Sequence, residues 1–420
     1  MQTRFDALIV GAGPAGSSAA ILLAMAGWSV ALVEKQSFPR RKVCGECVAA
    51  SNLPLLDALG IGAEFMAQAG PELRRVAVMR DQRCVTADLP PAIHPKHAWG
   101  RALGRETLDT LLLNRARAVG AVVMQPWAVQ NINGSAGDYR CSVREVSSDR
   151  TDLLQAPVAI FAHGSWEPLP GARAVERRAR HGSDLLAFKA DFDRATLTAG
   201  LLPVLLFNGG YGGMVLGHNR VVTVACCIRA DRLATLRLAA PGKSAGEVVE
   251  AMLIRECQGV AAALEGAQRS GVWLASGPLA PGVRLHRDQQ IFRIGNAAGE
   301  AHPLIGEGMS MALQSAWLLC AGLVRARQQH GVIDSAAWQG NVHQQYAAEW
   351  RRHFMPRLQL AASFAHLAMR PAASAALIAL LRRWPALLSR GAAWAGKARC
   401  AADVTTVNSL FLQSLPGEQQ

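Results

Sequence analysis

Cysteine is scarce in this chain, with nine scattered residues among 420. That number is too small for a disulfide scaffold, so we expect a reduced, cytoplasmic protein. No run reaches the roughly 18 consecutive apolar residues that a membrane span needs. The first six residues also lack the charged and then apolar layout of a signal peptide. Because internal repeats and low-complexity tracts are missing as well, the sequence predicts a globular, soluble chain.

Acidic residues are also few, 31 Asp and Glu against 44 Lys and Arg, which leaves a formal net charge of +13. Half of the residues are apolar and 18% are charged, a balance that excludes a disordered or fibrous protein. The length is about two to three times that of a typical domain. We therefore expect one large core or two coupled domains.

The first forty residues predict a strand, a glycine-rich turn, a helix and a second strand. The short branched run at 7–10 is typical of a strand buried on both faces of a parallel sheet. It leads into G-x-G-x-x-G at 11–16, an apolar helix over 15–26 and a strand over 29–33. This order indicates a dinucleotide-binding unit.

Each residue type in this unit has a mechanical reason. Gly11 allows the tight turn, Gly13 lets a diphosphate approach the backbone, and Gly16 lets helix and strand pack closely. The N–H groups and positive dipole at the helix start, from Ala15 onward, would hold the diphosphate. Glu34 follows the second strand, where a carboxylate can accept hydrogen bonds from ribose hydroxyls. The alternative is a glycine-rich turn that binds no ligand.

Three further motifs resemble one family of flavoproteins. F-P-R-R-K-V-C-G-E at 38–46 resembles the F-P-R-x-K-x-C-G element of geranylgeranyl reductase-like proteins, a group within the superfamily of aromatic hydroxylases and flavin-dependent halogenases. R-A-L-G-R-E-T-L-D-T-L-L from residue 101 is similar to the family's R-x-x-L-D-x-x-L helix. The block at 294–309 resembles its second FAD signature. The resemblance extends from residue 4 to about 320 and implies FAD as the dinucleotide.

The resemblance also assigns cofactor contacts along the chain. Arg41 and Lys42 stand in the first shared element, and Arg105 matches the arginine that approaches the FAD phosphates. Val129 falls where family members place a backbone group against adenine. A solvated charge at a helix start remains the alternative for Arg105.

The second signature predicts a contact with the flavin ring itself. Pro303, Gly306, Gly308 and Met309 open a helical stretch, so backbone N–H groups and the helix dipole can point at the pyrimidine edge. Reduction places negative charge at that edge, and positive potential there stabilises it. The alternative is a loop that only caps the helix.

The chain departs from the family pattern in two places. Asn296 replaces the usual Asp of the second signature, and an amide can still hydrogen-bond ribityl or ribose hydroxyls. The sequence at 163–166, His-Gly-Ser-Trp, replaces the Asp-Gly of aromatic hydroxylases, which puts the usual docking of a pyridine nucleotide in doubt. No second glycine-rich fingerprint follows a strand. Electrons must come from transiently docked NAD(P)H or from a partner flavin reductase.

These patterns predict an α/β protein with a discontinuous Rossmann-like FAD domain. Its parts are residues 1–181 and 286–330, separated by an antiparallel-sheet substrate domain at 182–285 and followed by a helical C-terminal region at 331–420. Asn133-Gly134 predicts the turn of a hairpin, and a helix is expected near 245–263.

Three features are candidates for the substrate site. Tyr211 lies in a glycine-rich stretch where it could orient a substrate or shield the ring; the alternative is a flexible turn. His302 could act as an acid, a base or a hydrogen-bond donor, unless it is merely packed or solvated. Cys44 and Cys47 form a C-x-x-C, but they lack the helix context of thioredoxins. No metal site is predicted.

The reaction follows less directly. A hydroxylase protects a flavin C4a-hydroperoxide in a dry pocket, and a prenyl reductase needs a long apolar tunnel. The related halogenases use a lysine and usually carry G-W-x-W-x-I-P, whereas here no two tryptophans are two residues apart and no lysine lies between Lys42 and Lys96. We therefore expect a monooxygenase of a small aromatic or polyketide-like secondary metabolite. A reductase of isoprenoid-type C=C bonds and a non-catalytic flavin-binding accessory protein remain alternatives.

Residues 351–400 carry nine Lys and Arg and no acid, which is +9 of the total +13. Apolar helical stretches alternate with these charges and are broken by Pro385. Such a surface could hold an anionic membrane, an acidic carrier protein or an acidic substrate. The alternative is a helical cover with solvated arginines. Nucleic acid is not an expected partner, because no nucleic-acid motif is present.

Overall fold

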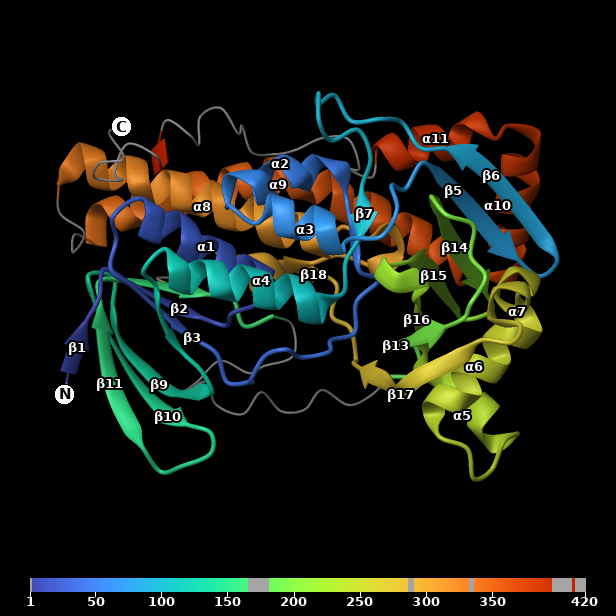
Figure 1. Cartoon of the computed structure of the whole chain (residues 1–420), viewed down its shortest axis with the longest axis horizontal. Coiled ribbons are helices and arrows are strands. Elements are labelled where there is room, and N and C mark those ends of the chain that lie inside the picture. Colours follow the sequence, from blue (N-terminus) through green and yellow to red (C-terminus); the bar gives the residue numbers. More distant parts are fainter. Residues whose placement is uncertain (1, 165–180, 286–290, 332–335, 395–409, 412–420) are drawn as a thin grey trace.

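A parallel sheet carries the glycine-rich turn, in the computed structural model that describes residues 2–164, 181–285, 291–331, 336–394 and 410–411 (Figure 1). Its strand order is β19-β12-β2-β3-β8, and all four strand pairs are parallel. The strands are β2 (Ala7–Val10), β3 (Val30–Val33), β8 (Val122–Met124), β12 (Val158–Phe161) and β19 (Phe292–Arg293). The short apolar runs therefore form buried parallel strands, as their composition predicts.

A larger sheet lies at the other end of the molecule (Figure 1). Its order is β17-β13-β16-β15-β14-β5-β6, antiparallel except between β14 and β5. The strands are β5 (Arg75–Arg80), β6 (Arg83–Asp88), β13 (Leu185–Asp193), β14 (Leu201–Phe207), β15 (Gly210–Leu216), β16 (Val222–Arg229) and β17 (Gln268–Ser276). β5 and β6 come from the 1–181 segment, so the chain enters this sheet before residue 182. The division at 181, 285 and 330 stays a prediction.

A third sheet, ordered β1-β11-β10-β9, packs beside the parallel one. Its strands are β1 (Gln2–Arg4), β9 (Trp127–Ser135), β10 (Asp138–Glu145) and β11 (Thr151–Ala156). The hairpin between β9 and β10 exists, but its turn is at residues 136–137 and not at Asn133-Gly134. Gly134 sits inside the ladder, where a Cβ would lie 2.0 Å from the carbonyl oxygen of Asp138. The glycine serves this close approach, so the turn prediction was wrong by three residues.

Short strand pairs and helices complete the fold. The pairs join β4 (Cys47–Val48) to β7 (Arg101–Ala102) and β18 (Gly282–Val283) to β20 (Gly299–Glu300). The helices are α1 (Pro14–Met25), α2 (Leu53–Ala58), α3 (Gly62–Gln68), α4 (Arg105–Ala118), α5 (Ala230–Leu238), α6 (Ala245–Glu256), α7 (Gln258–Leu264), α8 (Gly308–His330), α9 (Ala336–Ala368), α10 (Pro371–Arg383) and α11 (Ala386–Ala392). The helix predicted over 245–263 is therefore two helices, which meet at Cys257.

Two long helices connect the ends of the molecule. α8 and α9 pack against each other, with α8 on α1 beside the parallel sheet and α9 reaching the large sheet (Figure 1). By length and composition α8 could cross a membrane, but 78% of its most apolar window is buried in the protein, as in a core helix. α9 and α10 pass the same test only as one span bent by 107°.

The core is divided between these layers. One apolar cluster fills the space between the parallel sheet and α1, α4, α8 and α9, and a second lies between the large sheet and α5 to α7. A third lies on the opposite face of the large sheet, under α9 and α10. The predicted α/β class, with a Rossmann-like part, a second sheet and a helical C-terminal region, is confirmed.

Candidate active site

The turn between β2 and α1 packs tightly against backbone at Gly11 and Gly16 but leaves space at Gly13. Gly11 has φ +99°, and a Cβ there would lie 2.7 Å from the carbonyl oxygen that follows β12. A Cβ on Gly16 would lie 1.8 Å from the carbonyl oxygen of Gly11. A Cβ on Gly13 would instead lie 3.7 Å from a guanidinium nitrogen of Arg105 and 4.0 Å from one of Arg40. The open side of the turn thus faces two arginines.

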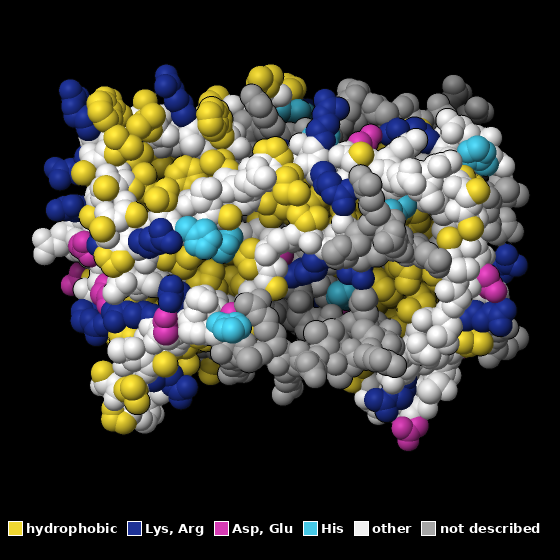
Figure 2. Space-filling view, turned by 180° about the vertical axis from the view of Figure 1, so that it is seen from behind, with side chains coloured by type: hydrophobic (Ala, Val, Ile, Leu, Met, Phe, Trp, Pro, Cys, Tyr) yellow, Lys and Arg dark blue, Asp and Glu magenta, His cyan; other side chains and the backbone are white. Residues whose placement is uncertain are grey.

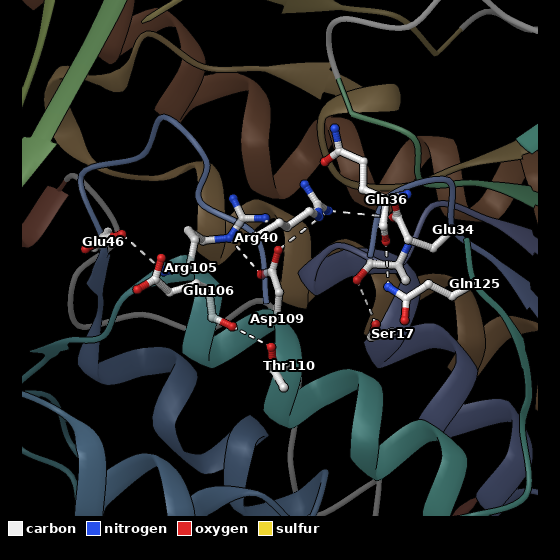
Figure 3. Close-up of polar contacts among 11 residues, drawn as sticks. Ser17, Glu34, Gln36, Arg40, Glu46, Arg105, Glu106, Asp109, Thr110 and Gln125 are labelled. Atoms are coloured by element: carbon white, nitrogen blue, oxygen red, sulfur yellow. Dashed lines mark hydrogen bonds and ion pairs between the residues drawn. The ribbon is translucent and has the colours of Figure 1, made fainter. Parts of the chain in front are cut away.

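Two carboxylates hold these arginines in place (Figure 3). Glu34, at the end of β3, accepts from the N–H of Ala12 at 2.9 Å and lies 3.7 Å from Arg40. Asp109 is fully buried and accepts from Nε and Nη2 of Arg105 at 2.8 and 2.7 Å. Burial opposes the charge of Arg105, but Asp109 outweighs it and raises the pKa of the guanidinium. Arg105 therefore stays charged and fixed beside the turn.

The two basic residues that follow Arg40 diverge. Lys42 belongs to the same cluster, where burial and the charges of Arg105 and Arg40 lower its pKa from 10.5 to about 8. Arg41 instead crosses to the large sheet, with Nη2 2.7 Å from Asp191 Oδ2 on β13. Arg41, a predicted cofactor contact, therefore points away from the glycine-rich turn. Arg40, which we did not predict as a contact, faces the turn.

The second FAD signature, at 294–309, packs against the glycine-rich turn at 11–16. A Cβ on Gly295 would lie 2.9 Å from the Cβ of Ala15, and the N–H of Gly295 donates to Ser315 Oγ on α8 at 2.8 Å. Asn296 follows in the same short helical turn and is half-buried. The carboxyl ends of β2, β12 and β19 therefore meet at one place, although the chain reaches them far apart.

The loop before α8 is rigidly supported from behind. After the turn at Pro303–Ile305, Gly306 adopts φ +64° and α8 begins at Gly308. The side chain of Glu307 is fully buried and turns back to Arg357 of α9, 3.2 Å away. The first N–H groups of a helix lack acceptors within the helix. The loop can therefore offer them to a ligand on its outer side.

These residues fit an FAD. Gly13 leaves room where a diphosphate would approach the start of α1. Arg40 Nε is buried and has no hydrogen-bond partner among the described residues, as expected of a donor waiting for an anion. Glu34 lies at the strand end where a ribose would bind. Positive charge for the diphosphate comes from Arg105, Arg40 and Lys42. The loop at 303–308 would contact the flavin ring.

A second set of groups lies on the face of the large sheet that α9 covers. The hydroxyl of Tyr211, on β15, is 3.2 Å from His302 Nδ1 and also hydrogen-bonds with the thiol of its cross-strand neighbour Cys227. Burial raises the pKa of Tyr211 well above its usual value and that of Cys227 to about 12. Burial and the neighbouring His366 lower the pKa of His302 to about 4. At neutral pH all three groups are uncharged.

Two small residues lie beside Tyr211 on the same sheet face. Gly213 and Ala225 are cross-strand partners in the middle of the sheet, yet both are half-buried. Lys189 on β13 is the next cross-strand partner of Ala225. The apolar cluster that contains Tyr211 also includes Leu304 of the loop before α8.

A buried ionic network lies next to Ala225 on the same sheet. Lys189 is 2% exposed and pairs with Glu46, whose other oxygen accepts from Thr223 at 2.9 Å. Thr223 Oγ1 also lies 2.7 Å from Asp191, and Glu46 accepts from the N–H of Arg105 at 3.1 Å. The network therefore ties the large sheet to the arginine beside the glycine-rich turn.

The structure brings most predicted site residues into two adjoining groups. Tyr211 and His302, two separate candidates for the substrate site, contact each other. Val129 packs in an apolar cluster with Val10 and Phe161, near the strand ends. Cys44 accepts from the N–H of Glu46, and no disulfide joins Cys44 to Cys47. Residues 165 and 166 of the unusual His-Gly-Ser-Trp lie outside the described residues.

Several residues of the site escaped the sequence analysis: Arg40, Glu46, Asp109, Lys189, Asp191, Thr223, Cys227 and Arg357. Two of them left a local signal: Arg40 is the arginine of the F-P-R-x-K-x-C-G element, and Asp109 follows Arg105 by four residues on a helix. The others meet partners far away in the chain.

Residues 4–337 match the family described as FAD binding domain. The chain belongs to this family. The predicted membership of the FAD-dependent oxidoreductase superfamily is thereby confirmed, and FAD is its cofactor. As a member of the FAD binding domain family, the chain is an FAD-dependent oxidoreductase.

The known proteins that resemble this chain have names that describe different functions. Menaquinone reductase of Mycolicibacterium smegmatis is 29% identical over 83% of this chain and 82% of its own. Conditioned medium factor receptor 1 of Dictyostelium discoideum is 25% identical over 77% of this chain, which spans 64% of the receptor's length. The structure of the myxobacterial chondrochloren halogenase superposes with TM-score 0.74 over 99% of this chain and 98% of its own, at 17% identity. At that identity the halogenase shows a shared fold alone.

Proposed function

We propose that this FAD-dependent oxidoreductase is a monooxygenase of a small aromatic or polyketide-like secondary metabolite. The single observation that carries the proposal is the buried, uncharged pair of Tyr211 and His302, which are 1% and 8% exposed. Burial lowers the pKa of His302 to about 4 and raises that of Tyr211 well above its usual value, so neither group is charged at neutral pH. Oxygen-transferring flavin chemistry needs a buried site that excludes water.

The side chains of the substrate face have separate tasks in this proposal. Bound FAD supplies two-electron transfer at its ring system. Tyr211 donates its hydroxyl proton in a hydrogen bond to a substrate oxygen, and neutral His302, 3.2 Å away, orients the hydroxyl. Gly213 and Ala225, which carry little or no side chain, would let a flat ring lie against the sheet. Lys189 stays paired with Glu46, which also accepts from the N–H of Arg105 and so links the substrate face to the cofactor end.

The electron source is part of the same proposal. Among the described residues, one glycine-rich strand–turn–helix unit is formed by β2 and α1, and we assign it to FAD. We infer that NAD(P)H docks transiently or that a partner flavin reductase delivers the electrons. Mixing the oxidised holoenzyme anaerobically with NADH, with NADPH or with a reductase and free flavin separates these sources by which one bleaches the flavin.

The reaction is tested by reducing the holoenzyme anaerobically and then mixing it with oxygenated buffer in a stopped-flow spectrometer. A monooxygenase gives a transient absorbing band before the oxidised spectrum returns. A panel of phenols and polyketide-like aromatics is then incubated with labelled dioxygen, and label must enter one product. Reduced enzyme that reoxidises without a transient and incorporates no label contradicts the proposal.

A reductase of isoprenoid-type C=C bonds is the second candidate. It is favoured by the 29% identity with a menaquinone reductase over most of both chains. In this case the reduced holoenzyme is stable in the absence of oxygen until a polyprenyl quinone or a similar unsaturated lipid is added. Stoichiometric reoxidation by that lipid, with two hydrogens gained by the product, would replace the monooxygenase proposal.

A further inference from the structure

Helices α10 and α11 cover the open end of the large sheet (Figure 1). Their inner side is apolar as expected: Ile378 and Leu381 are buried in the cluster that also contains Tyr211. α11 reaches the edge strand β6, where Ser389 donates to the carbonyl oxygen of Asp88 at 2.7 Å. Both helices are thus packed onto the protein along one side only.

The outer side of α10 and α11 also carries apolar side chains. A helix that only covers a core is polar on its outer face. Trp384 is 52% exposed and Trp394 is 74% exposed, and Leu380 and Leu387 are exposed next to them. Figure 2 shows hydrophobic side chains gathered over this end of the molecule, with Lys and Arg around them. Scattered single apolar residues need no explanation, but a contiguous group on one surface does.

The charges on the same surface have one sign. Between residues 367 and 394 every charged side chain is an arginine: Arg370, Arg382, Arg383 and Arg390, all exposed. The sequence holds no Asp or Glu from 350 to 402. Lys397 and Arg399 lie outside the described residues. We call residues 380–394 the α10–α11 surface.

We propose that the α10–α11 surface docks on an anionic lipid bilayer. Tryptophan rings prefer the headgroup region of a membrane, leucines enter the acyl boundary beneath them, and arginines pair with lipid phosphates. An acid-free, arginine-bordered apolar surface matches that environment in both charge and polarity. The docking does not depend on which reaction the flavin performs, although the same helices cover the substrate face of the sheet.

The test is co-sedimentation of the full-length holoenzyme with vesicles of phosphatidylcholine alone and with about one third phosphatidylglycerol. We expect binding to the anionic vesicles, weakened at high salt. Trp384→Ser with Leu387→Ser should reduce it roughly 10-fold. Arg382→Gln with Arg383→Gln should reduce it roughly 25-fold at low salt, at about fivefold for each charge.

The control variants remove an exposed apolar side chain and an exposed arginine outside the α10–α11 surface. Val272→Ser removes a 72% exposed apolar side chain of β17, and Arg140→Gln removes an exposed arginine of β10. Both should bind like the unchanged protein, and FAD content should confirm that every variant is folded. No binding to either vesicle overturns the proposal, as does binding that ignores the α10–α11 substitutions. Capture by an acidic carrier protein, or concentration-dependent dimerisation, in place of vesicle binding also overturns it.

Discussion

The two halves of the site are built in different ways. The FAD end relies on backbone: Gly11, Gly13 and Gly16 lie within six residues, and each is required by a close approach or an open face. The substrate end relies on side chains from distant parts of the chain, as in the buried pair of Glu46 and Lys189, 143 residues apart. The cofactor end therefore depends first on local backbone geometry, while the substrate face depends on partners that the fold must bring together.

Breaking the buried pair should have the largest effect. In Lys189→Met a buried carboxylate loses its cation, and we expect a loss of about 3–5 kcal/mol in the free energy of unfolding. Urea unfolding of the FAD-free protein measures it. Lys243→Met, at an exposed lysine, is the control and should change little.

A double variant sharpens the same point. In Glu46→Gln with Lys189→Met no charge is left unpaired, so part of the lost stability should return. A double variant as unstable as the sum of both single variants would show that the pair does not act as a unit.

Gly11→Ala tests the backbone end. The new Cβ would meet a carbonyl oxygen at 2.7 Å in a residue held at φ +99°, so the turn must shift. We expect FAD affinity to fall about 100-fold, or about 2.7 kcal/mol, by flavin fluorescence titration. Gly340→Ala in α9, where nothing lies within 4 Å, is the control. Unchanged affinity for Gly11→Ala would remove the basis of the comparison.

Tyr211→Phe tests the substrate end without disturbing the cofactor. Loss of a donor to substrate should lower turnover about 10-fold, while FAD content and the rate of flavin reduction stay unchanged. Tyr139→Phe, which removes a buried hydroxyl from β10, is the matched control. A parallel loss of FAD in Tyr211→Phe would assign the residue to cofactor binding instead.

A graded effect is expected from pH. Lys42 has a pKa of about 8 in the FAD-free protein, and a bound diphosphate raises it, so binding takes up a proton above pH 8. FAD affinity should therefore fall up to tenfold per pH unit from pH 8 upward, by titration at several pH values.

The stability of the FAD-free protein should move in the opposite direction. Unfolded Lys42 binds its proton up to about pH 10.5 and the folded one only to about 8, so this group adds stability between those values as pH rises. Lys42→Arg, which stays charged, should flatten both profiles. A falling affinity that persists in Lys42→Arg would assign the proton to another group.

Local sequence determined the cofactor end of this protein. The strand at Ala7–Val10, the glycine spacing and the helix that follows are all contiguous, and steric limits on glycine act within a few residues. The family motifs likewise predicted Arg105, Asn296 and the loop before α8. Even here a neighbouring residue was missed, because the direction of Arg40 and Arg41 depends on Asp191 in another sheet.

Tertiary structure alone decided the substrate end and the outer surface. Which side chains meet across β13, β15 and β16 depends on strand order and register, and these follow from packing of the whole sheet. The same holds for the pKa of His302, which burial lowers, and for the face that α10 leaves exposed. Burial and long-range pairing are properties of the folded chain, so no short stretch of sequence contains them.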